Sequence, residues 1–424
     1  MGQTQSYPNF RWFVLLALVV ATAASTILMI APAPLMGEVA HSLSIDPGMA
    51  TGIVMGLWNI LGATSCLVAG FLVDRFGVNK LMIAGCIIFI VPTLFFPMAG
   101  KNLGLIILLR AIQACGVGPV TSILGPLAAT WFPENQRGAV AGIQGVATSA
   151  GVGLGFAIAP KTFMATHSWL ATMGWMTIAP VIALILCAAI PFGPKPPAFQ
   201  DEMDETAKAE AQGAFAKALK TPTTWFLIAC VFISCWFFTG TNDLTPGYIA
   251  INAPTGLGYG PVVAGKLMGI YQLFFMVGGF LVGALFTKVF KGSARAAVGI
   301  GFLVSAATIC TIMLPSVYSS VGNLAKVLPL AAFFAAWIMP SAMAFIAINY
   351  HHSIVGRVTG LAFGIGLYAG IPGIIVGSAL LTKTGNYHAS ITLVTCVAVL
   401  GAVLSQFIRP LVKRAKVQAP ALEA

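Results

Sequence analysis

The sequence is poor in charged residues. Only 8% of its 424 residues are Asp, Glu, Lys or Arg, whereas typical soluble domains contain about 25%. Hydrophobic residues account for 58%, and the mean hydropathy is +0.93. A transmembrane helix needs about 20 apolar residues, and uncharged runs of that length recur along the chain. The composition excludes an ordinary soluble protein and predicts an all-α polytopic membrane protein.

Acidic residues are the scarcest charged type, with 11 Asp and Glu against 22 Lys and Arg. In a soluble protein, this excess of positive charge would suggest nucleic acid as a partner. In a membrane protein, Lys and Arg retain loops on the cytoplasmic side, so we expect the lipid bilayer and no nucleic acid as a partner.

The chain also lacks the signatures of enzymes and of metal or ATP sites. No Walker, GxSxG, HExxH or EF-hand pattern occurs. The eight cysteines form no CxxC pair and lie in apolar runs, which favours small buried hydrophobic side chains over disulfides or metal ligands. We therefore expect no enzymatic activity, no cofactor and no metal.

Charge-poor runs predict twelve membrane spans. Most of the 22 Lys and Arg residues fall at the chain ends and in the even-numbered turns, so we expect both termini to be cytoplasmic and the chain to be a multi-pass protein of the inner (plasma) membrane. The predicted spans are 12–35, 49–73, 81–99, 103–131, 139–160, 169–191, 222–249, 264–287, 296–318, 327–350, 358–381 and 388–408.

One long hydrophilic stretch, 192–221, divides the spans into two sets. We predict an N-terminal six-helix half at 1–191, a cytoplasmic linker at 192–221, and a C-terminal six-helix half with a short tail at 222–424. The residues that open spans five and eleven, 137–145 and 356–364, both place an Arg before closely spaced glycines. This similarity predicts two parallel pseudo-repeats.

Two short motifs give the chain a family resemblance. The turn between spans two and three follows the pattern G-x-L-x-D-R-x-G-x-x-K, and span four carries R-x-x-Q-A-x-G. In these motifs the chain resembles the major facilitator superfamily of secondary transporters. The matching residues are Gly70, Leu72, Asp74, Arg75, Gly77 and Lys80 in the first motif, and Arg110, Gln113, Ala114 and Gly116 in the second.

The resemblance implies a conformational latch on the cytoplasmic side. Asp74 would approach the start of span eleven, near Arg137, join the two halves there and favour the outward-open state. The alternative is a topological anchor in which the basic residues only keep the turn inside. The predicted latch comprises Gly70, Asp74, Arg75, Gly77, Lys80 and Arg137.

The resemblance is incomplete in three places. The second-half copy of the first motif is degraded after Gly283, span five lacks the proline of the antiporter signature, and span one contains no acid. The last two departures argue against proton-driven export of drugs or metabolites, which is the alternative function.

Charged residues inside spans are functional candidates because their insertion is costly. Arg110 and Gln113 share a helix face and could hold a carboxylate, or Arg110 could be a structural element of the fold. Asp243 is a candidate proton carrier, with an outer-loop Asp before Pro246 as the alternative. Further candidates for the substrate site are Asn59, Tyr271, Gln272, Trp337 and Ser341.

These observations predict a secondary active transporter that works by alternating access. Basic groups outnumber acids near the spans, which favours a small organic anion such as a carboxylate, moved by proton symport or by anion exchange. A membrane receptor without transport is the alternative from another class. We expect a monomer whose partners are the small-molecule substrate and a coupling proton or counter-anion.

Overall fold

The computed structural model describes residues 8–196, 213–350 and 352–410. Within them, twelve helical segments are long and apolar enough to cross a membrane, and no strand occurs. The predicted twelve-span, all-α fold is confirmed. The predicted linker lies partly outside the described residues.

The first half of the chain forms six of these segments, several of them interrupted. A Gly or Pro occurs at or beside most of the interruptions, as expected for residues that break helical hydrogen bonding. The elements are α1 (Arg11–Ile30), η1 (Ala33–Leu35), α2 (Met36–Leu43), α3 (Pro47–Phe76), α4 (Val78–Phe95), η2 (Phe96–Met98), α5 (Leu103–Cys115), α6 (Val117–Thr121), α7 (Leu124–Trp131), α8 (Glu134–Thr166), α9 (Trp169–Trp175), α10 (Ile178–Ala189) and η3 (Ile190–Phe192).

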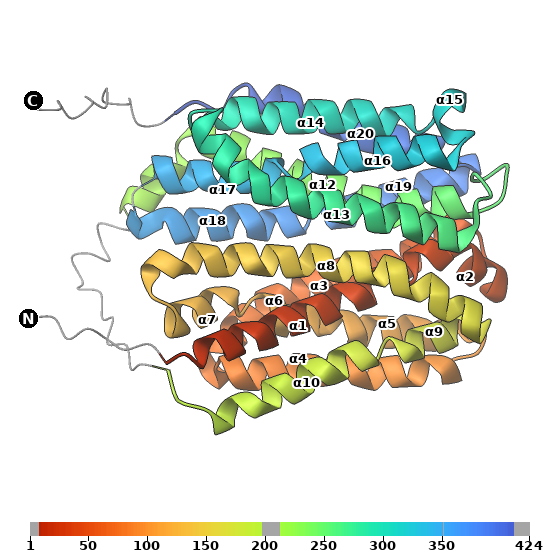
Figure 1. Ribbon diagram of the computed structural model, residues 1–424, viewed down its shortest axis with the longest axis horizontal. Helices are drawn as coiled ribbons and strands as arrows, with labels where there is room; N and C mark the ends of the chain where they lie inside the picture. The colour runs from red at the N-terminus through yellow and green to blue at the C-terminus, as the bar shows by residue number, and fades with distance from the viewer. Residues whose placement is uncertain (1–7, 197–212, 351, 411–424) are drawn as a thin grey trace, which may run out of the picture.

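The second half repeats this arrangement with fewer breaks. Its elements are α12 (Pro222–Ala250), α13 (Gly260–Lys288), α14 (Ala294–Thr311), α15 (Pro315–Tyr318), α16 (Val321–Ala335), α17 (Ile338–Asn349), α18 (His352–Leu367), α19 (Gly370–Thr384) and α20 (His388–Ser405). Figure 1 shows α1 to α10 in one group and α12 to α20 in another. The first and last described residues lie at the same end of the molecule, which we call the terminus side.

On the side opposite the termini, α3 packs closely against α19. A Cβ added to Gly48 would lie 2.7 Å from the main-chain nitrogen of Thr382, and one added to Gly52 would lie 2.9 Å from Ser378 Oγ. Asp46 caps α3 by accepting from the Gly48 and Met49 N–H groups, and it also accepts from Thr382 Oγ1 at 2.8 Å. Because lipid gives little hydrophobic drive for helix association, this close approach of small residues holds the halves together.

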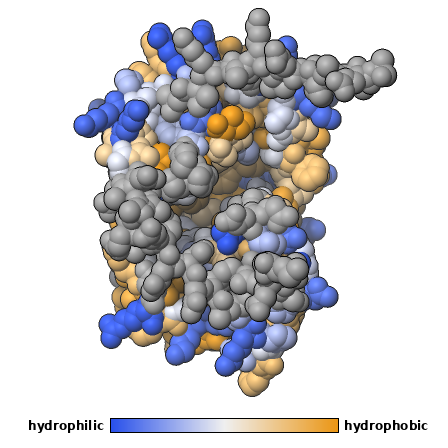
Figure 2. All heavy atoms as spheres, turned by 90° about the vertical axis from the view of Figure 1, so that its left-hand side faces the viewer, coloured by the Kyte–Doolittle hydropathy of each residue, from blue (hydrophilic) through white to orange (hydrophobic). Residues whose placement is uncertain are grey.

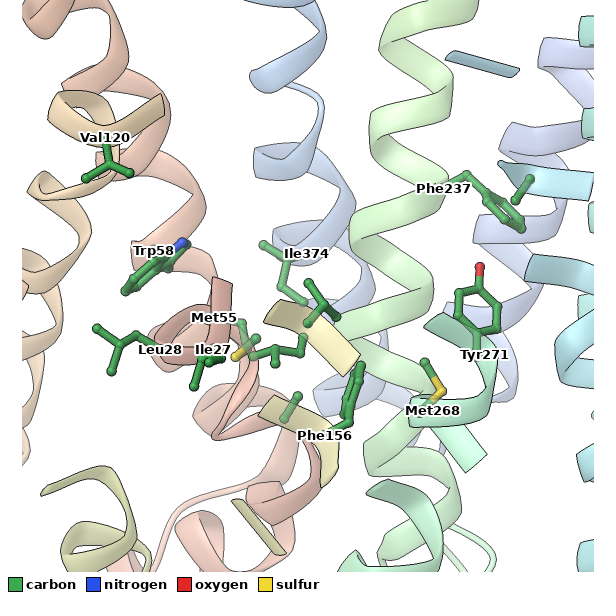
Figure 3. Packing of buried hydrophobic residues seen from close by; sticks show 14 of the residues in the cluster. Ile27, Leu28, Met55, Trp58, Val120, Phe156, Phe237, Met268, Tyr271 and Ile374 are labelled. Atoms are coloured by element: carbon green, nitrogen blue, oxygen red, sulfur yellow. The ribbon is translucent and has the colours of Figure 1, made fainter. Parts of the chain in front are cut away.

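A second contact between the halves joins α8 to α13 on the same side. Gly265 lies so close to the Phe156 main-chain oxygen that an added Cβ would overlap it. Figure 3 shows apolar side chains from both halves, including Met55, Phe156, Met268 and Ile374, gathered in this part of the molecule. The side opposite the termini is therefore closed.

The terminus side is open between the halves. A Cβ added to Gly142 or Gly145 of α8, or to Gly356, Gly360 or Gly364 of α18, would meet no atom of the described residues within 4 Å. Figure 2, which views this side, shows a recess between the two groups of helices. The same pairs of helices are thus in contact at one end and separated at the other, which is the geometry of one state of an alternating-access protein.

Closure of the side opposite the termini therefore depends on glycine at position 265. We expect Gly265→Val to open that side, because overpacking costs about 1–3 kcal/mol and the clash is with main-chain atoms. A cysteine introduced at Ser378, in a background without the native cysteines, should become more reactive toward a membrane-impermeant thiol reagent. Gly283→Val is the matched control, since a Cβ at Gly283 meets nothing within 4 Å. Equal labelling in both variants would contradict the assignment.

Candidate functional site

Arg110, on α5, is almost completely buried and holds three helices together. Its Nε donates to the Val54 main-chain oxygen at 2.9 Å, and Nη2 donates to the Met29 oxygen at 2.7 Å. Nη1 donates to the Leu28 oxygen at 2.8 Å and to Gln113 Oε1 at 2.7 Å. Four of the five guanidinium N–H groups are therefore used inside the first half in this state.

The acceptors explain why a cation is stable at this position. Leu28 and Met29 lie in the last turn of α1, where main-chain carbonyls lack helical partners and the helix dipole favours a positive charge. The Arg110 guanidinium also lies 4.4 Å from the centre of the Trp58 ring, a cation–π distance. Gln113 is fixed in turn, because its Nε2 donates to Thr93 Oγ1 at 2.6 Å. The geometry favours the structural interpretation of Arg110 over a bidentate grip on a carboxylate.

Asp243 lies inside α12 and is 2% exposed. The helix continues through Pro246 to Ala250, so the alternative of a loop Asp before a break is wrong. The Asn59 Nδ2 of α3 donates to Asp243 Oδ2 at 3.4 Å and to the Met55 oxygen at 3.0 Å. A buried carboxylate of the second half is therefore in contact with an amide of the first.

Neighbouring side chains extend this contact into a polar layer between the halves. Gln272 Nε2 of α13 donates to Asn242 Oδ1, and its own Oε1 is buried without a partner among the described residues. We use the name inter-half polar layer for Asn59, Asn242, Asp243 and Gln272. Gly153 of α8 lies against Gln272, because a Cβ added to Gly153 would be 3.4 Å from the Gln272 Cβ. The layer therefore touches the contact between α8 and α13.

Arg110 and Asp243 are the only buried charged side chains among the described residues. They lie in different halves, near enough for their charges to attract each other. The adjacent residues Trp58 and Asn59 connect them, since Trp58 contacts the cation and Asn59 contacts the acid. Buried charges in membrane proteins mark ion or substrate pathways, so this pair is the strongest candidate for a functional centre.

The other predicted substrate residues are spread more widely. Tyr271 precedes Gln272 and is buried, with a hydroxyl that has no partner in the described part of the chain, and Figure 3 shows it in the region of Phe237. The ring of Trp337 packs within the second half, against Phe290, Phe333 and Phe334. Ser341 follows it on α17 and is buried, and its Oγ has no partner among the residues that the structure describes.

Sequence reasoning missed the importance of Asn242 and Trp58. Both are immediate neighbours of residues that it did select, Asp243 and Asn59. The available signal for both residues was their position beside a polar or charged residue inside a span. It was weak because adjacent residues on a helix do not share a face.

The latch residues lie at the open terminus side. The Asp74 side chain is outside the described residues, so the latch stays a prediction. Gly77 ends α3 with φ +77°, a conformation that favours glycine. Arg137 Nε donates to the Phe132 oxygen at 3.2 Å. The side chains of Arg75 and Lys80 and the chain at Gly70 are exposed.

A family comparison identifies this architecture. The model of the Major Facilitator Superfamily matches residues 13–371. The chain belongs to the major facilitator superfamily. Members of this family with this fold are membrane transporters and not enzymes, and they bind small-molecule substrates. The family and the twelve apolar helices make this facilitator a multi-pass membrane protein.

Three named transport proteins are similar to the chain. The putative metabolite transport protein YwtG of Bacillus subtilis is 30% identical over 142 residues, which are 34% of this chain and 30% of that protein. The probable sulfoacetate transporter SauU of Cupriavidus necator is 24% identical over 392 residues, 85% of each chain. The multidrug transporter AQR1 of Candida glabrata is 26% identical over 162 residues, 37% of this chain and 26% of that one.

Solved structures agree on the fold. A bacterial homologue of the human lysosomal transporter Spinster, inward-facing and occupied, matches with a TM-score of 0.71 and 15% identity over 94% of this chain and 97% of that one. The unoccupied inward-facing form matches with a TM-score of 0.68 and 14% identity over 95% of both chains. Identities this low establish the facilitator fold alone.

Proposed function

We propose that this facilitator is a secondary active transporter that moves a small organic anion together with a proton. The carrying observation is the arrangement of Arg110 and Asp243, one buried cation and one buried acid in different halves, connected through the adjacent residues Trp58 and Asn59. The relative SauU is named for sulfoacetate, a small anion, and is similar to this chain over 85% of both chains. This similarity supports a small anionic substrate.

The proposed substrate site is the inter-half polar layer, at the closed end of the region between the halves. Asn59 and Gln272 present amide groups there, and Tyr271, the neighbour of Gln272 on α13, carries an O–H donor that has no partner among the described residues. Arg110 would act mainly by making the potential positive next to these donors, because its guanidinium is already bonded to main-chain oxygens. Gln113 would hold that guanidinium in place by accepting from its Nη1. Neutral donors beside a fixed cation favour an anion.

Asp243 is the proposed proton carrier. In the present state it is buried against Asn59. Opening the opposite side would separate α3 from α12 and α19, break the contact with Asn59, and expose the carboxylate to the other aqueous phase. Access of one acid to alternate sides is what coupling of a proton to the conformational cycle requires.

The proposed orientation places both termini in the cytoplasm of a bacterial cell, with the chain in the inner membrane. The excess of Lys and Arg at the ends and in the even-numbered turns supports it. In this orientation the recess between the halves opens to the cytoplasm, and the contacts made by Gly48 and Gly265 close the outer side.

The proposal is tested with purified protein in proteoliposomes under an imposed pH gradient. We expect saturable accumulation of at least one short sulfonate or carboxylate, such as sulfoacetate or a two- to four-carbon carboxylate, driven by an inward proton gradient. A thermal-shift screen of the same anions, with sugars, amino acids and cationic dyes as comparison compounds, selects the substrates. Stabilisation by cationic dyes alone would contradict the proposal and support a drug transporter instead.

A further inference from the structure

A groove runs along the outer face of the second half, between α14 and α20. Its volume of about 610 Å³ is within the range of small-molecule sites, about 300–1,000 Å³. Figure 1 shows both helices at the edge of the molecule, remote from the first half. The groove is therefore separate from the region between the halves.

Most of the groove is apolar and faces the bilayer. Leu303 of α14 is 57% exposed, and Val399 and Val403 of α20 are 44% and 52% exposed. Large exposed apolar side chains on membrane-spanning helices contact lipid acyl chains. The walls of the groove are thus suited to a hydrocarbon chain lying along the helices.

The end of the groove near the terminus side is polar and positively charged. Arg295, in the first turn of α14, is exposed, and its Nε donates to Gln406 Oε1 at 2.9 Å. Gln406 Nε2 in turn donates to Ser405 Oγ at 3.1 Å. This bond fixes the guanidinium plane, and the two Nη groups have no partner among the residues that the structure describes. They are available to a ligand at the level of the lipid headgroups.

The surrounding sequence contains cations and no acid. Lys291 precedes α14 and Arg409 follows α20, and both are exposed. Between Asp243 and Glu423 the chain contains no Asp or Glu. Among the residues of this part of the chain, the ammonium group of a zwitterionic headgroup would therefore meet like charges, whereas a phosphate without an ammonium would meet opposite charges.

We propose that this groove binds an anionic phospholipid, with the phosphate on Arg295 and one acyl chain between α14 and α20. The proposal rests on the continuity of an apolar groove with a guanidinium of which one N–H group is bonded, and on the absence of carboxylates from residues 244–422. Arg is well suited to phosphate because its planar fork donates two parallel hydrogen bonds. The inference does not depend on the transported substrate.

The test counts lipids bound to the full-length protein by native mass spectrometry, after delipidation in detergent. Phosphatidylglycerol, phosphatidylcholine and inorganic phosphate are titrated separately. We expect phosphatidylglycerol to bind more tightly than phosphatidylcholine, and Arg295→Gln to weaken phosphatidylglycerol about fivefold, the effect of one basic residue near an anionic headgroup. Ala402→Phe, which fills the groove and keeps Arg295, should weaken both lipids.

Lys220→Gln is the matched control, because it removes an exposed cation from the loop before α12 and leaves the groove unchanged. Equal binding of the two lipids, or equal loss in Arg295→Gln and Lys220→Gln, would overturn the proposal. Binding of inorganic phosphate as tight as that of the lipid would assign the site to free phosphate. A change of oligomeric state in Ala402→Phe without a change in lipid binding would assign the groove to a second copy of the chain.

Discussion

Replacement of Asp243 by Asn is expected to abolish proton-driven accumulation while exchange of substrate across the membrane continues. Asp243 is the only buried carboxylate among the described residues, so no second acid in this part of the chain can substitute for it. With one proton per substrate, a gradient of about one pH unit supports about tenfold accumulation. In the variant the internal and external concentrations should become equal.

The measurement pairs two assays on the same proteoliposomes: uptake driven by a pH gradient, and counterflow of labelled against unlabelled substrate. The Asn amide oxygen can still accept from Asn59, so the contact seen at 3.4 Å and the closed state should persist. Glu38→Gln serves as the control, because it neutralises an exposed acid on α2. Proton dependence equal to that of the unmodified protein would remove Asp243 from the mechanism.

Replacement of Arg110 by Ala is expected to abolish uptake and to destabilise the protein. The change removes four hydrogen bonds, and side-chain hydrogen bonds in membrane proteins contribute on average about 0.6 kcal/mol each. We therefore expect a loss of about 2–3 kcal/mol, with the carbonyls at the end of α1 left without donors. Asp243 would also lose its one buried counter-charge.

Arg110→Lys separates the two roles of this residue. Lys keeps the positive charge but donates from a single nitrogen, so it cannot reach all four acceptors that the three guanidinium nitrogens of Arg110 bond. We expect Arg110→Lys to retain substrate-induced thermal stabilisation, although its melting temperature falls. Arg110→Ala should have a lower melting temperature and no substrate-induced stabilisation. Lys161→Ala, which removes an exposed cation from α8, should change neither. Normal uptake by Arg110→Ala would refute a role in anion transport.

The twelve spans could be predicted because bilayer thickness fixes the length of an apolar run. Their ends were less predictable where helices continue beyond the apolar run. The first span was predicted to end at residue 35, but the helical segment extends to Leu43. Glu38 and His41 end the hydrophobic signal there, although α2 continues as a helix.

The roles inside the site were harder to predict, for two physical reasons. Arg110 binds main-chain oxygens of α1 and α3, and main-chain acceptors leave no signature in a sequence, so the binding and structural interpretations could not be separated. Asp243 and Asn59 are 184 residues apart, and their contact depends on how the halves pack. The sequence identified both residues as polar groups in spans, but their pairing required the structure.

The separation of Arg110 and Asp243 into different halves has a consequence for bioenergetics. An empty carrier with an ionised Asp243 has one buried positive and one buried negative charge, so its core is electroneutral. Binding a proton and a monovalent anion together leaves the core electroneutral again. A carrier that has bound the proton alone, or the anion alone, has a net charge in the membrane interior, which costs several kcal/mol. We therefore expect one proton to move with each monoanion, at a rate insensitive to the membrane potential.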